Sequence, residues 1–460
     1  MKIIKNLILF LMVIACVFLS SQVWLQIPDF LSLNKEDDKV AEKEPDINLW
    51  NIVKPNKYIL KSQNSLKEFY LENDIVFWQK AVENLEVALK KFSESQYSTI
   101  GGEFYPEEYV MLEFENKLPL EIFTGKFGLS KDNIKTKLNY IEKIVFGLNE
   151  NKNIYIYNGD STVIIKNSLI NNAELYKDLK TLSDDSYVEY IQNIEVGGEI
   201  IPIPIPNIKN ASNPVFVQSE LDVKNKAAIE DIAKEYFKNS YDYVRKSEDI
   251  EGDILYNYKN EKVLKISSEG LLDFFDSNIN IDNSSDVYES LMIALKFAMN
   301  FLDPPPDMYL SEVNVAQNDG NFGYEFVFTY RILNKPILFS KVRESSALEV
   351  EVIGNNVVSY KRFIRNRDTK QDSEMKKEEI LSFEEVLENQ LSVTDEGAMT
   401  NNTLKVIDKS MVKDIDNVYL AYFDYARSIK EQHLIVVWVV EIKDKVYIFN
   451  AITGSLLEEQ

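Results

Sequence analysis

The chain has 460 residues, 45% of them hydrophobic, so it is long enough for two or three domains with real cores. Its 74 acidic residues outweigh 51 basic ones and give a net charge of −23, which excludes the basic footprint that nucleic-acid binding needs. The single cysteine, Cys16, falls in a hydrophobic segment, so disulfides and thiolate catalysis are excluded from the rest of the chain.

The sequence predicts one transmembrane helix over residues 7–27. Residues 7–19 are all apolar, and residues 7–24 would form a helix about 27 Å long, close to the roughly 30 Å of a bilayer core. Lys2 and Lys5 precede the segment, which predicts a cytoplasmic tail at residues 1–6 and the bulk of the chain outside the cytoplasm. We expect Trp24 at the outer membrane interface, and Pro28 to end the helix.

Two other interpretations of this segment stay open. A cleaved signal peptide would have a shorter core and a small-residue cleavage site, and no such site is evident. A lipoprotein signal is the second, because Val13-Ile14-Ala15-Cys16 resembles a lipobox, although the hydrophobic run continues after Cys16. All three interpretations place the bulk of the chain outside the cytoplasm.

Met12, Cys16 and Ser20 are candidates for contact with another transmembrane helix. Cys16 and Ser20 lie one helical turn apart, and small residues at that spacing let helices approach closely. The alternative is that these side chains face lipid.

Residues 34–46 are polar and charged with few aromatics, so residues 28–45 are predicted to be a stalk, and residues 46–212 a first extracytoplasmic domain. A helix follows Asp74, because apolar residues recur at helical spacing from Trp78 to Phe92. Residues 154–165 predict a hairpin whose turn is Asn158-Gly159, both with positive φ. The alternating prolines at residues 202–206 predict an edge strand or linker, with a domain boundary shortly after.

Residues 213–372 predict a central domain and residues 373–460 a C-terminal one. In the central domain a helix over residues 287–302 precedes strands, and residues 365–377 are predicted to be a charged linker. The C-terminal domain begins with a capping box at Ser382 and Glu385 and contains a buried strand over residues 434–440. This order of a helix and then antiparallel strands occurs twice, so the predicted fold class is α+β: antiparallel sheets with packed helices.

No pattern of residues predicts catalysis, a cofactor or a metal site. His433 is the only histidine, and it is interpreted as structural or as a surface residue. No nucleophile elbow, zinc motif, phosphate-binding loop or complete calcium loop occurs. A pair of catalytic carboxylates stays open as an alternative, because among 74 acidic residues some pair always looks plausible.

Several short motifs, in order, resemble the YycH family of Gram-positive bacteria and the related YycI. They are Val23-Trp24-Leu25-Gln26-Ile27-Pro28 after the anchor, residues 256–272, Gly323-Tyr324-Glu325-Phe326, Lys335-Pro336-Ile337, residues 348–360, and the final Val436-Val437-Trp438 and residues 450–454. The last of these is also PepSY-like. A proline usual before the late tryptophan is replaced by Val437, and residues 46–212 match only in length and type.

The resemblance implies a regulator rather than an enzyme, with no cofactor. Its implied partners are an essential sensor histidine kinase of the WalK (YycG) type, which controls cell-wall metabolism, and a YycI-like protein. Contacts between transmembrane helices and between extracytoplasmic domains would carry the regulation, and the last two domains would be YycI-like and PepSY-like. The alternative function is a PepSY-like envelope-binding or inhibitory module, in a lipidated form.

Overall fold

The computed structural model describes residues 47–460, apart from residues 64, 71–73, 93–95, 130–133, 135–137, 149–151, 167–168, 182–186, 209–214, 278–285, 319–320, 342–345, 373–376, 393–406 and 426–430. The predicted transmembrane helix, the stalk, and Met12, Cys16, Ser20 and Trp24 lie outside the described residues. Within the described ranges, no helix combines the length and the apolar character that crossing a membrane would require.

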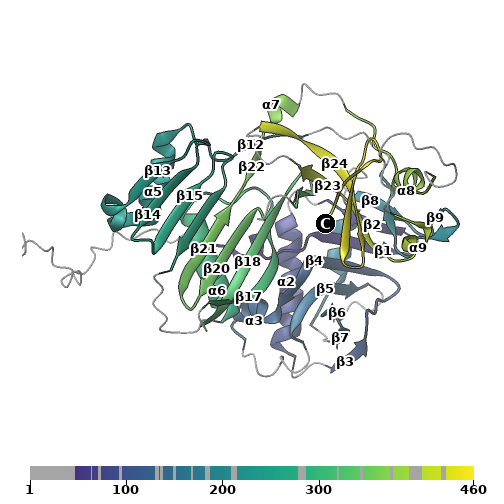
Figure 1. Cartoon of the computed structure of the whole chain (residues 1–460). Helices are drawn as coiled ribbons and strands as arrows, with labels where there is room; N and C mark the ends of the chain where they lie inside the picture. Colours follow the sequence, from purple (N-terminus) through teal and green to yellow (C-terminus); the bar gives the residue numbers. More distant parts are fainter. Residues whose placement is uncertain are drawn as a thin grey trace, which may run out of the picture. The chain divides into compact units, whose positions relative to one another are not determined.

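An antiparallel sheet forms the N-terminal part of the fold (Figure 1). Its strands are β1 (Lys57–Ser62), β2 (Ser65–Phe69), β3 (Gln96–Gly101), β4 (Tyr109–Pro119), β5 (Tyr140–Gly147), β6 (Asn153–Tyr157), β7 (Ser161–Lys166), β8 (Tyr187–Ile191) and β11 (Ile205–Pro206). As far as the described residues go, the order is β11-β8-β2-β1-β4-β5-β6-β7-β3. Pro206 therefore lies on an edge strand, as the alternating prolines predict.

One face of this sheet is covered by helices. They are α2 (Asp74–Lys90), α3 (Leu120–Phe127) and α4 (Ala173–Lys180), with a short 3-10 turn, η1 (Leu49–Asn51). Trp78 of α2 is fully buried, packs edge-on against Phe114 with ring centroids 5.8 Å apart, and donates from Nε1 to the Val53 carbonyl oxygen at 2.8 Å. The predicted apolar face from Trp78 to Phe92 is buried and confirmed.

Apart from β9 (Glu195–Val196) and β10 (Glu199–Ile200), which pair only with each other, the remaining described strands form a second, larger network. They are β12 (Val215–Ser219), β13 (Arg245–Glu248), β14 (Ile254–Tyr258), β15 (Lys262–Ile266), β16 (Leu272–Asp276), β17 (Met308–Asn318), β18 (Asn321–Ile332), β19 (Lys335–Phe339), β20 (Leu348–Ile353), β21 (Asn356–Arg362), β22 (Arg365–Arg367), β23 (Ile415–Asp424), β24 (Glu431–Ile442), β25 (Lys445–Asn450) and β26 (Leu456–Glu459). Pairing is antiparallel throughout this network except between β19 and β23, which run parallel.

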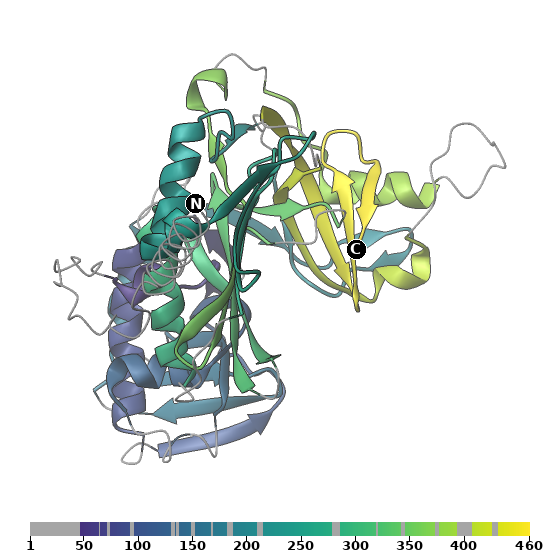
Figure 2. The same cartoon turned by 60° about the vertical axis from the view of Figure 1, so that its left-hand side comes forward.

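Helices α5 (Lys226–Phe237) and α6 (Val287–Phe301) lie on the same face of the central strands, as Figure 2 shows. Tyr236 of α5 and Phe297 of α6 both pack against Phe274 of β16, with centroids 4.8 and 5.6 Å from it. Asp286 caps α6 by accepting from the Glu289 amide at 2.9 Å. The smaller elements are η4 (Lys238–Tyr243), α7 (Thr369–Asp372), α8 (Phe383–Ser392), α9 (Lys409–Val412), β9 (Glu195–Val196) and β10 (Glu199–Ile200).

The capping box predicted at the start of the C-terminal segment is confirmed. The Ser382 amide donates to Glu385 Oε2 at 2.7 Å, and the Glu385 amide donates to Ser382 Oγ at 3.2 Å. The helix that follows, α8, packs Phe383 against Trp438 of β24, with ring centroids 5.7 Å apart. Local capping chemistry therefore marks this helix start correctly.

Two local predictions are wrong. The sequence predicts a linker over residues 365–377, but β22 pairs with β12, and Arg365 is almost fully buried, where an ion pair with Asp424 compensates its charge. In the hairpin turn only Gly159 has a positive φ, of 97°. Asn158 instead uses its side-chain oxygen to accept from the Asp160 and Ser161 amides at 3.1 and 2.9 Å.

The division into three extracytoplasmic domains, at residues 46–212, 213–372 and 373–460, stays a prediction. Residues 47–460 form one compact unit.

Candidate functional site

A cavity of about 270 Å³ lies where strands from three distant parts of the sequence meet. Its lining comes from β1, β2, β4, β8 and β11 of the N-terminal sheet, from β17, β18 and β19, and from β23 and β24. The charged lining residues are Lys57, Glu68, Glu113, Glu115, Arg331, Lys335 and Glu441, and the tyrosines are Tyr70, Tyr190, Tyr309 and Tyr419.

Strand alternation explains why charged residues gather on the N-terminal wall. Successive side chains of a strand point to opposite faces, so Leu112 and Phe114 of β4 face the helices while Glu113 and Glu115 face the cavity. The register places Glu68 of β2 opposite Ile59, on this same helix-free face.

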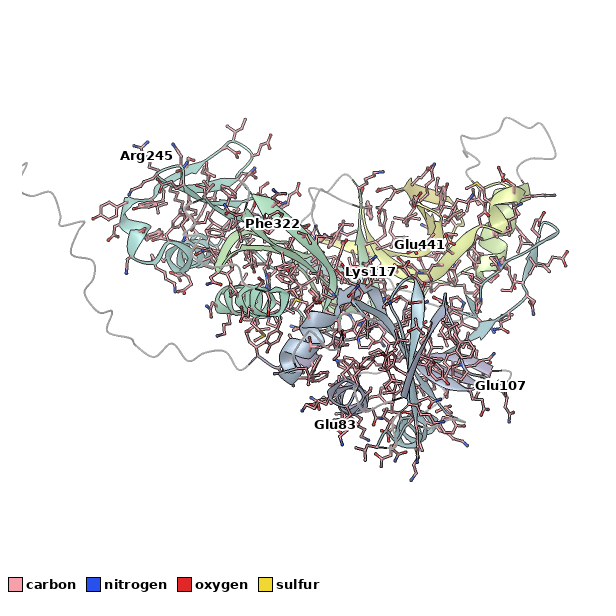
Figure 3. The ribbon with its side chains drawn as sticks, turned by 90° about the horizontal axis from the view of Figure 1, so that it is seen from below. Glu83, Glu107, Lys117, Arg245, Phe322 and Glu441 are labelled. Carbon is pink, nitrogen blue, oxygen red and sulfur yellow. The ribbon has the colours of Figure 1, made fainter. Side chains whose placement is uncertain are left out.

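The same argument holds for the C-terminal wall. Asn417 and Glu441 are paired residues of β23 and β24, and the Asn417 amide donates to Glu441 Oε2 at 3.3 Å. Their neighbours Leu420 and Trp438 are paired on the other face, where Trp438 packs against α8. Glu441 is labelled in Figure 3.

Two carboxylates on the N-terminal wall are each held by a tyrosine. Tyr190 donates its hydroxyl hydrogen bond to Glu68, and Tyr309 donates to Glu115 at 2.5 Å. Burial raises the pKa of Glu68 above its usual value, and Lys57 offsets this only in part. Burial, reinforced by Glu441, likewise raises the pKa of Glu115, against the hydrogen bond from Tyr309.

Glu115 has an exposed side chain, although desolvation of its carboxyl in the cavity raises the pKa of that group. It lines both this cavity and a second one. We therefore treat its carboxyl as partly desolvated.

The three described cations that line the cavity differ in their hydrogen-bond acceptors. Arg331 donates to Asp307 and to the Asn56 carbonyl oxygen, and Asp307 also accepts from Lys54 Nζ at 2.6 Å. Lys57 donates to Asn417 at 3.4 Å. Lys335 has no hydrogen-bond acceptor among the described residues; its Nζ lies 5.6 Å from the ring centroid of Tyr422, and burial lowers its pKa.

A second cavity, of about 370 Å³, adjoins the first. The two share Glu115, Asn116, Thr329, Ile337 and Leu338, so they lie side by side along β19. Glu312, Glu349 and Lys341 are the further charged residues of its lining.

Other ionic groups within the described ranges hold strands together. Arg365 Nε lies 3.1 Å from Asp424 Oδ2, with both side chains fully buried, and Asp424 also accepts from Gln432. His433 is exposed and packs edge-on against Phe216, with ring centroids 4.8 Å apart, which confirms its interpretation as a surface residue. Among the described residues, no group of three or more histidine, cysteine or acidic side chains is placed to hold a metal ion.

Sequence reasoning does not find the cavity. Its charged residues span positions 57 to 441, and no local motif links them. Only one sequence feature points toward the cavity. Charged residues at alternate positions of strands such as β4 indicate that one face of the sheet is polar, but they do not indicate which other strands pack against that face.

These observations define an α+β protein of antiparallel sheets, with buried ion pairs between strands and a charged cavity where the sheets meet. Residues 2–184 match the family described as YycH protein, N-terminal domain. This match identifies residues 2–184 as similar to the YycH N-terminal domain and leaves the rest of the chain outside the matched region.

Solved structures with some likeness have low identity. YycH from Bacillus subtilis has 16% identity and a TM-score of 0.48, over 87% of this chain and 97% of that one. An uncharacterized protein from Eubacterium rectale has 14% identity and a TM-score of 0.36, over 56% and 91% of the two chains. The YpeB C-terminal domain of Bacillus megaterium has 13% identity and a TM-score of 0.25, over 51% and 96%. No curated protein sequence matches the chain.

Proposed function

We propose that this protein is a membrane-anchored, extracytoplasmic regulator of a two-component sensor histidine kinase that controls cell-wall metabolism. The match of residues 2–184 to the YycH N-terminal domain is the observation that carries the proposal. The family is a regulatory one, so the proposed action is binding rather than catalysis.

The proposed mechanism is a bias between two states of the kinase. A single N-terminal helix packs against kinase helices in the membrane, and the large acidic domain contacts the kinase, or a YycI-like partner, outside the cytoplasm. A regulator of this kind shifts the kinase only if it binds its two signalling states with different affinity. The sequence features that support membrane contact are the apolar residues 7–19 and the small residues Cys16 and Ser20.

Co-purification tests this function. The full-length chain, solubilised in mild detergent, is used to capture the sensor kinases of its own cells, beside a shortened chain that begins at Leu33. We expect a sensor kinase with the full-length chain and its loss with the shortened one. Recovery of no sensor kinase after mild crosslinking would overturn the regulatory function, and equal recovery with both chains would overturn the role of the helix.

A further inference from the structure

The cations of the cavity compensate its two tyrosine-held carboxylates only in part: Lys57 and Arg331 lower the pKa of each, but burial outweighs them. Glu68 and Glu115 each accept one hydrogen bond from a tyrosine, and neither has a cation within ion-pair distance among the described residues. A carboxylate that is even partly desolvated is stabilised by a cation nearby, and folds normally supply one. Burial therefore leaves the pKa of both carboxyls above its usual value.

An unmatched charge of the opposite sign lines the same cavity. Lys335 begins β19 beside Pro336 and Ile337, and its ammonium has no acceptor among the described residues. Burial lowers the pKa of Lys335, and no ion pair joins it to Glu68 or Glu115. The fold thus holds opposite charges apart across one cavity.

We call the carboxylates of Glu68 and Glu115 the negative pole of the cavity and the ammonium of Lys335 its positive pole. The polar lining of the cavity also contains a group without a hydrogen-bond partner. The side-chain oxygen of Asn56 is buried and accepts no hydrogen bond within the described part of the chain. Arg331 is already committed to Asp307 and to the Asn56 carbonyl, so it does not supply the missing partner. A ligand with its own donors and acceptors would satisfy such a lining.

A metal ion is a poor fit to this site. A cation such as Ca²⁺ needs several oxygen ligands around one point. The described carboxylates are not gathered in this way, and a metal would leave Lys335 without a partner.

We propose that the cavity binds a small zwitterion of the amino-acid or short-peptide class, with its ammonium group against Glu68 and Glu115 and its carboxylate against Lys335. The ligand bridges the two poles that the fold keeps apart. This proposal stands on the cavity alone and does not depend on the kinase-regulating function.

Binding of unbranched glycine peptides to the full-length chain in detergent tests the proposal. Isothermal titration calorimetry measures glycine, diglycine, triglycine and tetraglycine, and the best of these is compared with its N-acetylated form and its C-terminal amide. The acetylated form lacks the ammonium and the amide lacks the carboxylate. We expect saturable binding of the free peptide and at least a tenfold loss with each blocked form.

Two variants assign each end of the ligand to its pole. In Glu68→Gln/Glu115→Gln, N-acetylation should no longer weaken binding, because the ammonium has lost its partners. In Lys335→Met, amidation should no longer weaken binding. The matched control is Glu83→Gln/Glu107→Gln, which changes the net charge equally at two exposed positions labelled in Figure 3 and should bind as the parent does.

Three results would overturn the proposal: no glycine peptide binds, the blocked forms bind as well as the free peptide, or Ca²⁺ binds and displaces the peptide. If Glu68→Gln/Glu115→Gln melts at a much lower temperature than the parent, Glu441→Gln on β24 replaces it. Glu441 lines the same cavity from the opposite wall, so its loss should also weaken binding of the free peptide.

Discussion

The guanidinium of Arg331 donates two hydrogen bonds to the carboxylate of Asp307, of 2.7 Å from Nε and 2.8 Å from Nη2. Lys54, which precedes β1, donates a third to the same carboxylate. Asp307 follows the three prolines that end α6 and has a φ of 57°, a left-handed conformation that aspartate tolerates better than most residues. One carboxylate therefore fixes the N-terminal segment to the central hairpin of β17 and β18.

This cluster predicts a loss of stability in acid. Burial alone would raise the pKa of Asp307, but Arg331 and Lys54 outweigh it and hold that pKa below its usual value. Because the pKa of Asp307 is lower in the folded state than in the unfolded state, the ionised carboxylate stabilises the fold. This stabilisation is fully present at pH values above the unfolded-state pKa of about 3.9, and it is lost as the pH falls through the folded-state pKa.

We therefore expect Asp307→Asn to lower the urea midpoint at pH 7 and to show a smaller further loss than the parent below pH 4. Asn keeps the left-handed backbone accessible, so the variant isolates the charge. Urea titrations of both proteins from pH 7 to pH 3 measure the difference, and parallel pH curves would contradict the assignment.

The two tyrosine-held carboxylates predict the opposite pH dependence. Their folded-state pKa values are raised, so their contribution to stability is fully present below the unfolded value and is lost as the pH rises through the folded one. The charged and titratable groups that interact with Glu68 are Lys57, Tyr70, Glu113, Tyr190 and Arg331. Those that face Glu115 are Lys57, Tyr309, Arg331 and Glu441.

Since glutamine still accepts the tyrosine hydrogen bond but carries no charge, Glu68→Gln/Glu115→Gln should melt at or above the parent's temperature at pH 7. The difference should shrink toward pH 4. Differential scanning calorimetry at both pH values measures it, and a large loss of stability at pH 7 would show that the ionised carboxylates stabilise the fold.

The fully buried pair Arg365 and Asp424 predicts strong coupling. Removing one partner leaves a buried charge without compensation, which costs roughly 3–5 kcal/mol. Asp424→Asn and Arg365→Met should each destabilise the protein strongly, and the double variant should cost less than their sum. A double-mutant cycle by urea unfolding measures the coupling, and additive effects would show that the pair is not coupled.

A backbone contact fixes where β18 meets β20. A Cβ atom at Gly323 would come within 2.0 Å of the Val352 carbonyl oxygen and 2.9 Å of Ile353 Cα. Backbone cannot yield cheaply, so Gly323→Ala should cost about 1–3 kcal/mol, as overpacking does. Gly101→Ala is the matched control, because Gly101 also lies in a strand and has open space around it; equal urea midpoints for the two variants would contradict the pairing.

The proposed contact between the N-terminal helix and the kinase helices can be tested by substitutions at Cys16 and Ser20. Replacing Cys16 and Ser20 together with leucine removes the small residues that would allow close helix approach, while the segment stays apolar. We expect weaker co-purification of the sensor kinase with unchanged membrane fractionation. Leu7→Val/Leu11→Val is the control, with two apolar changes at the same spacing. Undiminished capture with the leucine variant would show that this helix face is not used.

The elements that depend on local sequence are predictable, and those that depend on distant pairing are not. Capping at Ser382 and the apolar faces of α2 and α6 follow from residues a few positions apart, so sequence periodicity finds them. The charge of Arg365 suggests an exposed position and therefore a linker. That prediction fails because Asp424, the partner that compensates the charge in the interior, lies far along the chain. The cavity escapes prediction for the same reason: Glu68 and Glu441 meet only through the sheet order.

The position of β12 has a consequence for the order in which the chain acquires its structure. β12 pairs with β22 and β24, both of which come much later in the sequence, whereas β13 to β16 form consecutive hairpins. During synthesis, the backbone N–H and C=O groups of β12 stay unpaired until β22 and β24 have been made. Pairing between distant strands is also slow, because a long loop must close first. We therefore expect the pairing of β12 to be among the last folding steps. A chain whose synthesis stops before β24 should carry an exposed strand edge that chaperones or proteases bind.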